Sequence, residues 1–546
     1  MDPYESSKKR TKRYKKIKKL MKILYHYDNF KPKQYEIINQ IINGRDVCAI
    51  LPTGYGKSLT YQIPALYLDK PAIIVSPLIS LMDDQCLMLK EMGITSCCYN
   101  SNVSDKQKMK TEILQHKYKF IYITPEAIVR MQDFIKKLNR EIGISLIAID
   151  EAHCISSYGF DFRKPYRELS FVKEILPNTP VLAVTATATN TVCKDIFKVL
   201  GLKNYKFLKS SFDRPNLYLQ VQQKSKPETD IIPLIKKYAD ASIIIYCLKK
   251  KETEKMAALL ETYGIKCGVY HGGLDNHTKN TSHVQFIKGK IKVIAATIAF
   301  GMGINKSDVR VVIHYGCPKN IEGYYQEIGR AGRDGRDAFC HTFYNYGDFK
   351  LQERFISDIT DATFKNTRIK LLEIMKNYIT TKQCRRKMLL EYFGEEYRVN
   401  CKNCDNCRGV NQDYLKMENK PLQHVNNEAK MLINLIEAMN HKNFGIMTYI
   451  NILRGSKNKK ITEEIRKNEY YNRGKHRSIL WWKEMIDNLI SQKFLQLTFL
   501  NRNGQKYQVL KTTKQGILWC NLAEFGGLVN TSEIIELQPM KMTNTL

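Results

Sequence analysis

The sequence has little acidic charge and no long apolar stretch. It holds 54 Asp and Glu against 87 Lys and Arg, a net charge of +33, which favours a polyanionic partner. A generally lysine-rich surface would give the same count. No run approaches eighteen consecutive apolar residues, so no membrane-spanning helix and no membrane partner are expected. The basic segment at residues 8–22 has no apolar run behind it, which argues against a secretory signal and for an intracellular protein.

The sequence also lacks the regular cysteine spacing of a disulfide framework, and it lacks internal repeats. Four of the fifteen cysteines cluster near residue 400, and the other eleven are scattered, many of them inside β-like runs. Scattered core cysteines indicate a reducing compartment rather than a disulfide framework. There is no internal short-period repeat, and a length of 546 residues suggests about three to four domains.

What the sequence does contain is an alternation of short apolar runs with helix-like segments between about residues 27 and 345. Continuous apolar runs are typical of parallel sheets covered on both faces. They form two series, so we predict the α/β class, with two doubly wound parallel-sheet domains joined near Ser210-Ser211. The predicted strands lie at 47–51, 72–75, 120–123, 146–149 and 181–184, and then at 243–246, 293–296 and 309–313.

A candidate phosphate loop follows the first of these strands. Backbone N–H groups of a glycine-containing turn and the N-terminus of the next helix can cradle phosphates. Lys57, where we expect the helix to begin, can reach the β- and γ-phosphates, and the Ser58 hydroxyl can bind Mg²⁺. The strict pattern GxxxxGK[ST] has glycine where this chain has Leu51. The residues expected to bind ATP are Thr53, Gly54, Gly56, Lys57 and Ser58.

A second motif stands about a hundred residues further on, where the run 146–149 ends in Asp150-Glu151-Ala152-His153. A carboxylate at a strand end that faces the phosphate loop can hold Mg²⁺, and the adjacent Glu151 can orient or deprotonate the attacking water. The segment is not HExxH, which argues against a zinc hydrolase. Together the two motifs predict an ATP-hydrolysing site.

Two arginines, Arg330 and Arg333, stand in the second α/β series. Spaced three residues apart, they share one helix face. They could be ordinary surface charges. In a two-domain ATPase, however, an arginine from the opposite domain stabilises the charge on the transferring γ-phosphate. We therefore regard both as candidate catalytic residues, with Lys57, Asp150 and Glu151.

The clustered cysteines predict a structural metal site. The spacing C-x16-C-x2-C-x2-C suits tetrahedral Zn²⁺, and an iron–sulfur cluster is a competing interpretation of the same spacing. The residues between the last three cysteines are polar, which disfavours unrelated buried thiols. The predicted ligands are Cys384, Cys401, Cys404 and Cys407.

The last 120 residues carry no catalytic constellation. Helical patterns at 426–440, 445–454 and 477–491, followed by a hairpin, predict a winged helix. Its wing would span 495–511, with Asn503-Gly504 as the turn and Arg502 and Lys506 at the tip. The excess of Lys and Arg between 442 and 477 predicts contacts with nucleic-acid phosphates.

Taken in order, these motifs closely resemble the RecQ helicases of superfamily two over about residues 27 to 525. Eight segments in register are far more specific than any one of them. The matching segments are 30–34, 51–58, 76–82, 150–156 with 161–163, 185–189, 212–216, 296–306 and 326–335.

This resemblance implies a 3′-to-5′ ATP-dependent DNA helicase, acting in DNA repair, recombination or replication, with a structural zinc ion rather than an iron–sulfur cluster. It implies that Gln34 reads the adenine and that Ser76 and Thr297 touch the strand backbone. Thr185 and Thr187 would couple the ATP cleft to the strand, and Arg333 would be the arginine finger, assisted by Arg330. The implied domains are two RecA-like domains at 27–210 and 211–350, a zinc-binding subdomain at 351–412, a winged helix at 413–530 and a tail at 531–546.

Two segments depart from the family pattern. Lys31 replaces an arginine of the first motif, so a bidentate contact would be absent. The aromatic-rich loop has Tyr158 and Phe160 where the family has tryptophan and a second histidine. It keeps Phe162, and aromatic faces stack bases regardless of sequence. A base-sensing loop is still expected, although ordinary core aromatics would give the same pattern.

Two other functions fit part of the sequence. The ATP motifs are shared across superfamily two, so an RNA helicase or RNA-dependent ATPase is the main alternative. A catalytically idle DNA-binding scaffold is disfavoured by the intact catalytic residues. Residues 1–26 are expected to be a disordered basic arm that tethers nucleic acid or directs nuclear import. The protein would be nuclear if it comes from a eukaryotic or nuclear-replicating source, and otherwise cytoplasmic.

Overall fold

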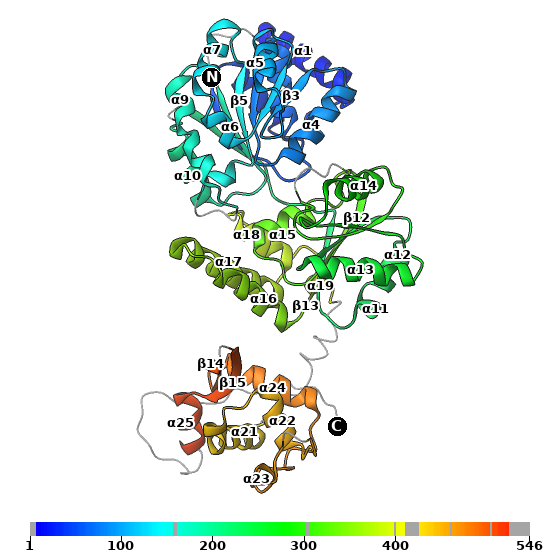
Figure 1. The fold of residues 1–546 in the computed structure, drawn as a ribbon, viewed down its shortest axis with the longest axis vertical. Helices are drawn as coiled ribbons and strands as arrows, with labels where there is room; N and C mark the ends of the chain where they lie inside the picture. The colour runs from blue at the N-terminus through cyan, green and yellow to red at the C-terminus, as the bar shows by residue number, and fades with distance from the viewer. Residues whose placement is uncertain are drawn as a thin grey trace. The chain divides into compact units, whose positions relative to one another are not determined.

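The computed structural model describes residues 7–156, 161–202, 204–301, 306–397, 400–409, 425–458, 461–502 and 505–522. The chain divides into two compact units, Met1–Arg408 and Gly409–Leu546, and each is described by itself (Figure 1). None of the helices in the described ranges combines the length and the apolar character of a membrane-spanning segment.

The first unit begins with a seven-stranded sheet in which every pair of neighbours runs parallel, in the order β3-β4-β2-β5-β6-β1-β7. Its inner strands are buried along their whole length, as expected for a sheet covered on both faces. The strands are β1 (Asp46–Ile50), β2 (Ala72–Val75), β3 (Ser96–Tyr99), β4 (Phe120–Ile123), β5 (Leu146–Asp150), β6 (Val181–Thr185) and β7 (Tyr205–Lys209). The helices are α2 (Gln34–Ile42), α3 (Leu59–Leu68), α4 (Ile79–Glu91), α5 (Lys106–Leu114), α6 (Pro125–Val129), α7 (Gln132–Glu141), η1 (Ala152–Ile155), α8 (Lys164–Arg167), η2 (Glu168–Ser170), α9 (Phe171–Ile175) and α10 (Asn190–Val199).

The second sheet has six strands, again all parallel, in the order β10-β11-β9-β12-β13-β8. Its presence confirms the predicted class of two α/β domains. The strands are β8 (Leu217–Gln223), β9 (Ser242–Cys247), β10 (Cys267–Tyr270), β11 (Val293–Ala296), β12 (Val309–Tyr315) and β13 (Ala338–Tyr344). The helices are α11 (Pro227–Asp230), α12 (Ile232–Lys237), α13 (Lys250–Thr262), α14 (Asn276–Ile287), α15 (Ile321–Ile328) and α16 (Tyr346–Ser357).

A helical, cysteine-containing segment completes the first unit with α17 (Ala362–Thr380), α18 (Arg385–Tyr392) and α19 (Asp405–Arg408). It packs on the outer strand of the second sheet. Cys404 forms a parallel bridge with Leu219 of β8, and the buried Asp405 carboxylate accepts a 2.8 Å hydrogen bond from the Val221 amide. Arg385 donates to the other oxygen of Asp405 at 2.6 Å. The segment is therefore fixed to the second α/β domain.

The second unit is a small helical domain with one antiparallel hairpin. Its core includes the fully buried Trp481 and Trp482. The hairpin confirms the predicted wing, whereas its turn at Asn503-Gly504 and the side chains of Arg502 and Lys506 lie outside the described residues. The elements are α21 (Asn426–Ala438), η3 (Asn440–Lys442), α22 (Ile446–Leu453), α23 (Glu463–Arg466), α24 (Ile479–Ser491), β14 (Leu495–Arg502), β15 (Gln505–Thr512) and α25 (Lys514–Leu522).

The N-terminal segment differs from the disordered arm that its charge suggests. Residues Ser7–Tyr25 form the helix α1. Ile17 and Met21, four residues apart on one face, are fully buried in a cluster with Ile38 of α2 and Ile63 of α3. The apolar contact anchors a segment that charge alone would keep unfolded.

Candidate active site and metal centre

The phosphate loop leaves β1 at Leu51 and reaches α3, which begins at Leu59, two residues later than expected. Gly54 and Gly56 have φ values of +77° and +79°, a left-handed conformation that favours glycine. A Cβ atom at Gly54 would also lie 2.9 Å from Cγ of Arg333 in the second domain. The glycines thus allow the loop to turn and let an arginine from the other domain approach it closely.

Lys57 is partly buried beside both carboxylates of the second motif. Its Nζ donates to Glu151 Oε1 at 3.0 Å and lies 4.0 Å from Asp150 Oδ1. Burial lowers the pKa of Lys57, but the two carboxylates outweigh it and hold that pKa above its ordinary value. Burial raises the pKa of Asp150, whereas at Glu151 the charge of Lys57 and the hydrogen bond from His153 overcome burial and lower the pKa. Glu151 is therefore held as a carboxylate.

A series of polar contacts runs from Glu151 into the second domain. His153 Nδ1 lies 3.3 Å from Glu151 Oε2 and 2.8 Å from Thr185 Oγ1. The Thr185 hydroxyl in turn donates to the Thr187 carbonyl at 3.3 Å, and Gln326 of α15 donates to the Thr187 hydroxyl at 3.2 Å. The two threonines thus connect the carboxylate of one domain with a helix of the other.

The two candidate arginines occupy different environments. The Arg333 side chain lies against the phosphate loop, and burial together with the nearby charges of Arg330 and Arg214 lowers its pKa to about 9. A phosphate anion would relieve this electrostatic cost. Arg330 is buried beside Tyr246 of β9. The geometry therefore favours Arg333 as the arginine that meets the nucleotide.

Arg214 is a cross-domain contact to which sequence reasoning assigned no role. It donates to the Thr53 carbonyl of the phosphate loop at 3.2 Å and to the carbonyls of Ala331 and Gly332, each at 2.9 Å. It lies in the matching segment 212–216, which was the available signal. Lys31, which departs from the family pattern, donates to the Gly54 carbonyl at 2.8 Å. Both cations thus hold the backbone of the loop.

Gln34, expected to read the adenine, also contacts the phosphate loop. Its Nε2 donates to the carbonyls of Tyr55 at 2.8 Å and Gly56 at 3.3 Å, while its Oε1 accepts from the Lys31 amide at 2.8 Å. Recognition of a base by this amide would require some of these hydrogen bonds to be exchanged.

The expected strand-contact residues lie at the ends of strands in both domains. Ser76 follows β2 and is buried, and Thr297 follows β11 and is partly exposed. Arg163 donates to the Pro77 carbonyl at 2.8 Å, which connects the segment after the aromatic-rich loop with that at Ser76. The ring centroids of Phe162 and Phe364 are 6.4 Å apart, whereas Tyr158 and Phe160 lie outside the described residues.

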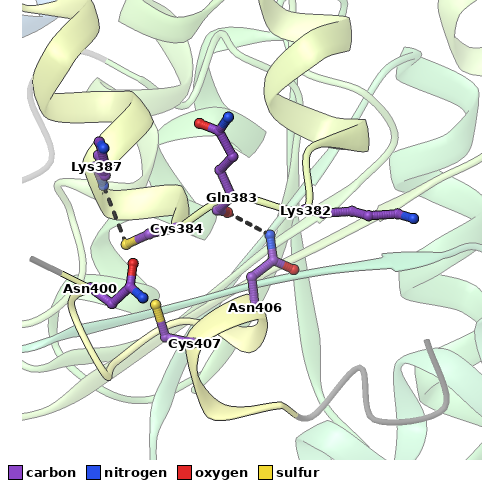
Figure 2. A pocket seen from close by; sticks show the side chains of 7 residues that line it. All are labelled: Lys382, Gln383, Cys384, Lys387, Asn400, Asn406 and Cys407. Carbon is purple, nitrogen blue, oxygen red and sulfur yellow. Dashed lines mark hydrogen bonds between the residues drawn. The ribbon is translucent and has the colours of Figure 1, made fainter. Parts of the chain in front are cut away.

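The four predicted metal ligands converge. The sulfur atoms of Cys384, Cys401, Cys404 and Cys407 all lie within 4.8 Å of one another, and those of Cys401 and Cys407 are 3.9 Å apart. Zn–S bonds of about 2.3 Å in a tetrahedron place the sulfurs about 3.8 Å apart, so the residues fit a zinc ion with four thiolates. Figure 2 shows Cys384 near the start of α18 and Cys407 in α19. The Lys387 amide lies 3.5 Å from Cys384 Sγ.

The metal-binding segment also holds the linker between the two α/β domains. Glu395 accepts hydrogen bonds from the Phe212 amide at 2.6 Å and the Ser211 hydroxyl at 2.7 Å, and Phe393 stacks on Phe212 with ring centroids 4.3 Å apart. Arg386 donates to Asp213 Oδ1 at 2.8 Å and to backbone carbonyls of the linker and β8. The linker is therefore bound along its length.

Comparisons with known proteins agree with this arrangement. Models of four families match successive parts of the chain: the DEAD/DEAH box helicase at residues 31–196, the helicase conserved C-terminal domain at 227–335, RecQ zinc-binding at 346–408 and the RQC domain at 421–521. The ATP-dependent DNA helicase RecQ of Haemophilus influenzae is 35% identical over 502 residues, which cover 91% of this chain and 79% of that protein. The chain belongs to the RecQ family of superfamily-two helicases. It is an ATP-hydrolysing helicase with a structural zinc site and an RQC, winged-helix region.

Other relatives of this RecQ chain carry different names. A protein of Acanthamoeba polyphaga mimivirus named as an ATP-dependent RNA helicase is 59% identical over 544 residues, covering 99% of each chain. The mouse exonuclease and helicase WRN is 36% identical over 91% of this chain, which spans 36% of the WRN length. Yeast Dbp5 bound to RNA and ADP BeF3 has a TM-score of 0.51 at 21% identity, covering 67% of this chain and 99% of that one. This last likeness shows the fold of the two RecA-like domains.

Proposed function

We propose that the chain is a DNA helicase that unwinds duplexes in the 3′-to-5′ direction. The observation that carries this proposal is the zinc-binding segment, which is fixed to the second RecA-like domain and followed by a winged-helix region. Both regions match family models, and a relative named as a DNA helicase is similar over 91% of this chain. DNA repair, recombination or replication is the corresponding cellular role.

In the proposed hydrolysis, the chain's own residues prepare the phosphates and the water. Lys57 exchanges its ion pair with Glu151 for the β- and γ-phosphates, and Asp150 with Ser58 holds Mg²⁺. The released Glu151 orients the attacking water and accepts its proton. Arg333, assisted by Arg330, stabilises the charge on the γ-phosphoryl group. Thr53, Gly54 and Gly56 shape the loop, and Gln34 recognises the adenine.

The polar contacts from Glu151 to Gln326 support a coupling role for Thr185 and Thr187. Hydrolysis changes the charge at the Glu151 end, and the other end lies on a helix of the second RecA-like domain. A change in the hydrogen bonds between them would alter how the two domains close on the strand held by Ser76 and Thr297.

RNA unwinding is the second candidate, because the mimivirus relative at 59% identity is named as an RNA helicase. Four substrates separate the two functions: DNA duplexes with a 3′ or a 5′ single-stranded tail, and RNA duplexes with the same tails. We expect ATP-dependent unwinding of the 3′-tailed DNA duplex and stronger stimulation of ATP hydrolysis by single-stranded DNA than by RNA.

The Lys57→Ala protein serves as the control, because it lacks the only side-chain cation of the phosphate loop. Any strand separation that it retains is not driven by ATP. Faster unwinding of either RNA duplex than of the 3′-tailed DNA would make the RNA helicase the correct function. Preference for the 5′-tailed DNA would reverse the proposed polarity.

Helix α1 is proposed to bind nucleic-acid phosphates from a fixed position. Its buried face holds Ile17 and Met21, whereas Lys12, Lys15 and Lys19 are exposed. Replacing these three lysines with alanine keeps a strong helix former at each position. We expect the slope of log K against log salt on duplex DNA to become shallower by about 0.9 for each phosphate that the helix no longer neutralises, with kcat at saturating DNA unchanged.

The matched control replaces Lys136, Lys137 and Arg140 of α7, also exposed cations of the first domain. Two of them already form ion pairs with Asp133 and Glu141, so their removal is expected to leave the slope unchanged. An unchanged slope in the α1 variant as well would contradict phosphate binding and leave nuclear import as the role of this segment.

A further inference from the structure

Two free thiols outside the ATP and zinc sites lie in direct contact. Cys86 is in α4, and Cys98 is in β3 at the edge of the first sheet. Their sulfur atoms are 3.0 Å apart. A disulfide bond measures about 2.05 Å, so closing the pair requires a movement of about 1 Å.

Both thiols are partly exposed, in contrast to cysteines such as Cys48 and Cys154, which are fully buried in the core. A small oxidant can therefore reach the pair. The neighbouring Cys97 is buried, because successive side chains of a strand point to opposite faces. Only Cys98 of these two residues faces α4.

The pair has an attacking and a resolving member. The hydrogen bond between the two thiols, in which either sulfur can be the donor, lowers the pKa of Cys86, although burial opposes this, and the same contact raises the pKa of Cys98. The thiolate is the nucleophile in thiol–disulfide exchange. Cys86 is therefore the thiol that attacks first, and Cys98 stands next to it.

We propose that Cys86 and Cys98 are a redox-modification site, at which a small-molecule disulfide oxidant such as oxidised glutathione forms an intramolecular disulfide. The Cys86 thiolate attacks one sulfur of the oxidant and forms a mixed disulfide, releasing one thiol. The Cys98 thiol then loses its proton and attacks Cys86 Sγ, which releases the second thiol. In total the protein gives up two protons and two electrons to the oxidant, which is reduced to two thiols.

The cross-link fastens α4 to β3. Helix α4 begins directly after the segment of Ser76 that we expect to touch the strand backbone. Its Asp84 also lies close enough to His283 of α14 in the second domain for the charge of His283 to lower the Asp84 pKa, against the larger effect of burial. Oxidation therefore restrains a helix that directly follows the strand-contact segment.

The test uses the full-length, zinc-loaded protein, incubated with oxidised glutathione under conditions in which the zinc stays bound. We expect peptide mapping without reductant to find a Cys86–Cys98 cross-linked peptide that disappears on reduction. Hydrogen exchange of the α4 amides should slow in the oxidised protein, while exchange in α5, which carries no cysteine, stays the same.

The Cys97→Ala protein is the matched control and is expected to form the same cross-link, whereas Cys98→Ala should stop at a glutathione adduct on Cys86. A wild-type protein that shows only glutathione adducts, or a cross-link through Cys97, would overturn the proposal. So would unchanged hydrogen exchange in α4 after complete oxidation. Because the mapping is done on the wild-type protein, a variant that fails to fold does not affect this outcome.

Discussion

Replacing Arg333 with alanine is expected to lower ATP turnover by about 10³- to 10⁵-fold, the range that arginine fingers contribute to phosphoryl transfer. The Arg333 side chain is partly buried, lies against Gly54 of the phosphate loop and has a pKa lowered to about 9, so a developing phosphate charge would be a favourable partner. Nucleotide binding should be largely retained, because Lys57 and the loop backbone remain. Single-turnover hydrolysis and a fluorescent-nucleotide titration measure the two quantities separately.

Arg336→Ala is the matched control, since Arg336 is exposed three residues further along the chain and its removal should leave turnover unchanged. If Arg333→Ala instead abolishes ATP binding while the rate per bound ATP stays normal, Arg333 is a binding residue. Arg330, beside Tyr246, would then become the candidate finger, and Arg330→Ala should show the decrease in turnover.

Replacing Glu151 with glutamine is expected to lower ATP hydrolysis by about 10²- to 10⁴-fold, the contribution typical of a positioned general base. Glutamine keeps the size of the side chain and removes the carboxylate that Lys57 and His153 hold in its ionised form. ATP binding should persist or tighten, because Lys57 no longer has to leave an ion pair of 3.0 Å to reach the phosphates. Pre-steady-state hydrolysis and equilibrium binding provide the two readouts.

Glu174→Gln, at an exposed position of α9 in the same domain, controls for the removal of one negative charge. Near-normal turnover in Glu151→Gln would remove Glu151 from the catalytic role. Asp150, whose carboxyl lies 4.0 Å from Lys57, would be the next residue to replace.

Much of the fold could be predicted from the sequence because strands buried on both faces have continuous apolar runs. The strands β1, β2, β4, β5 and β6 were all predicted, and each is buried throughout. The strands that were not predicted include all four sheet edges, β3, β7, β8 and β10. An edge strand has a neighbour on one side only, so its sequence can alternate or include charge, as the two lysines of β7 (Tyr205–Lys209) illustrate.

Helix α1 was missed for a related reason. Its ten cations between residues 8 and 22 dominate any composition argument, whereas its fully buried side chains are only Ile17 and Met21 among the described residues of the helix. Local charge favours an extended arm, whereas contacts of the apolar face with other helices stabilise the folded segment. A pattern cannot show that partner when it is formed by α2 and α3, later in the chain.

In the candidate site, too, the residues could be predicted from the sequence, whereas the contacts between them could not. Motif spacing predicted that Lys57, Glu151 and Arg333 belong to one site, and the structure brings them together. It could not predict that Lys57 pairs with Glu151, which depends on how the phosphate loop lies against the end of β5. Nor could it predict that Arg214 holds the Thr53 carbonyl, which depends on how the two domains face each other.

The bound linker also limits how far the chain can be shortened without loss of contacts. Without residues 346–408, the Phe212 amide would lose its acceptor Glu395, and the Phe212 ring would lose its stacking partner Phe393. The carbonyls of Arg214 and Leu217 would lose their donor Arg386. Unpaired backbone groups of this kind cost about 1–3 kcal/mol each when they stay buried. We therefore expect a protein shortened to its two sheets to have a loosened hinge as well as a missing metal site.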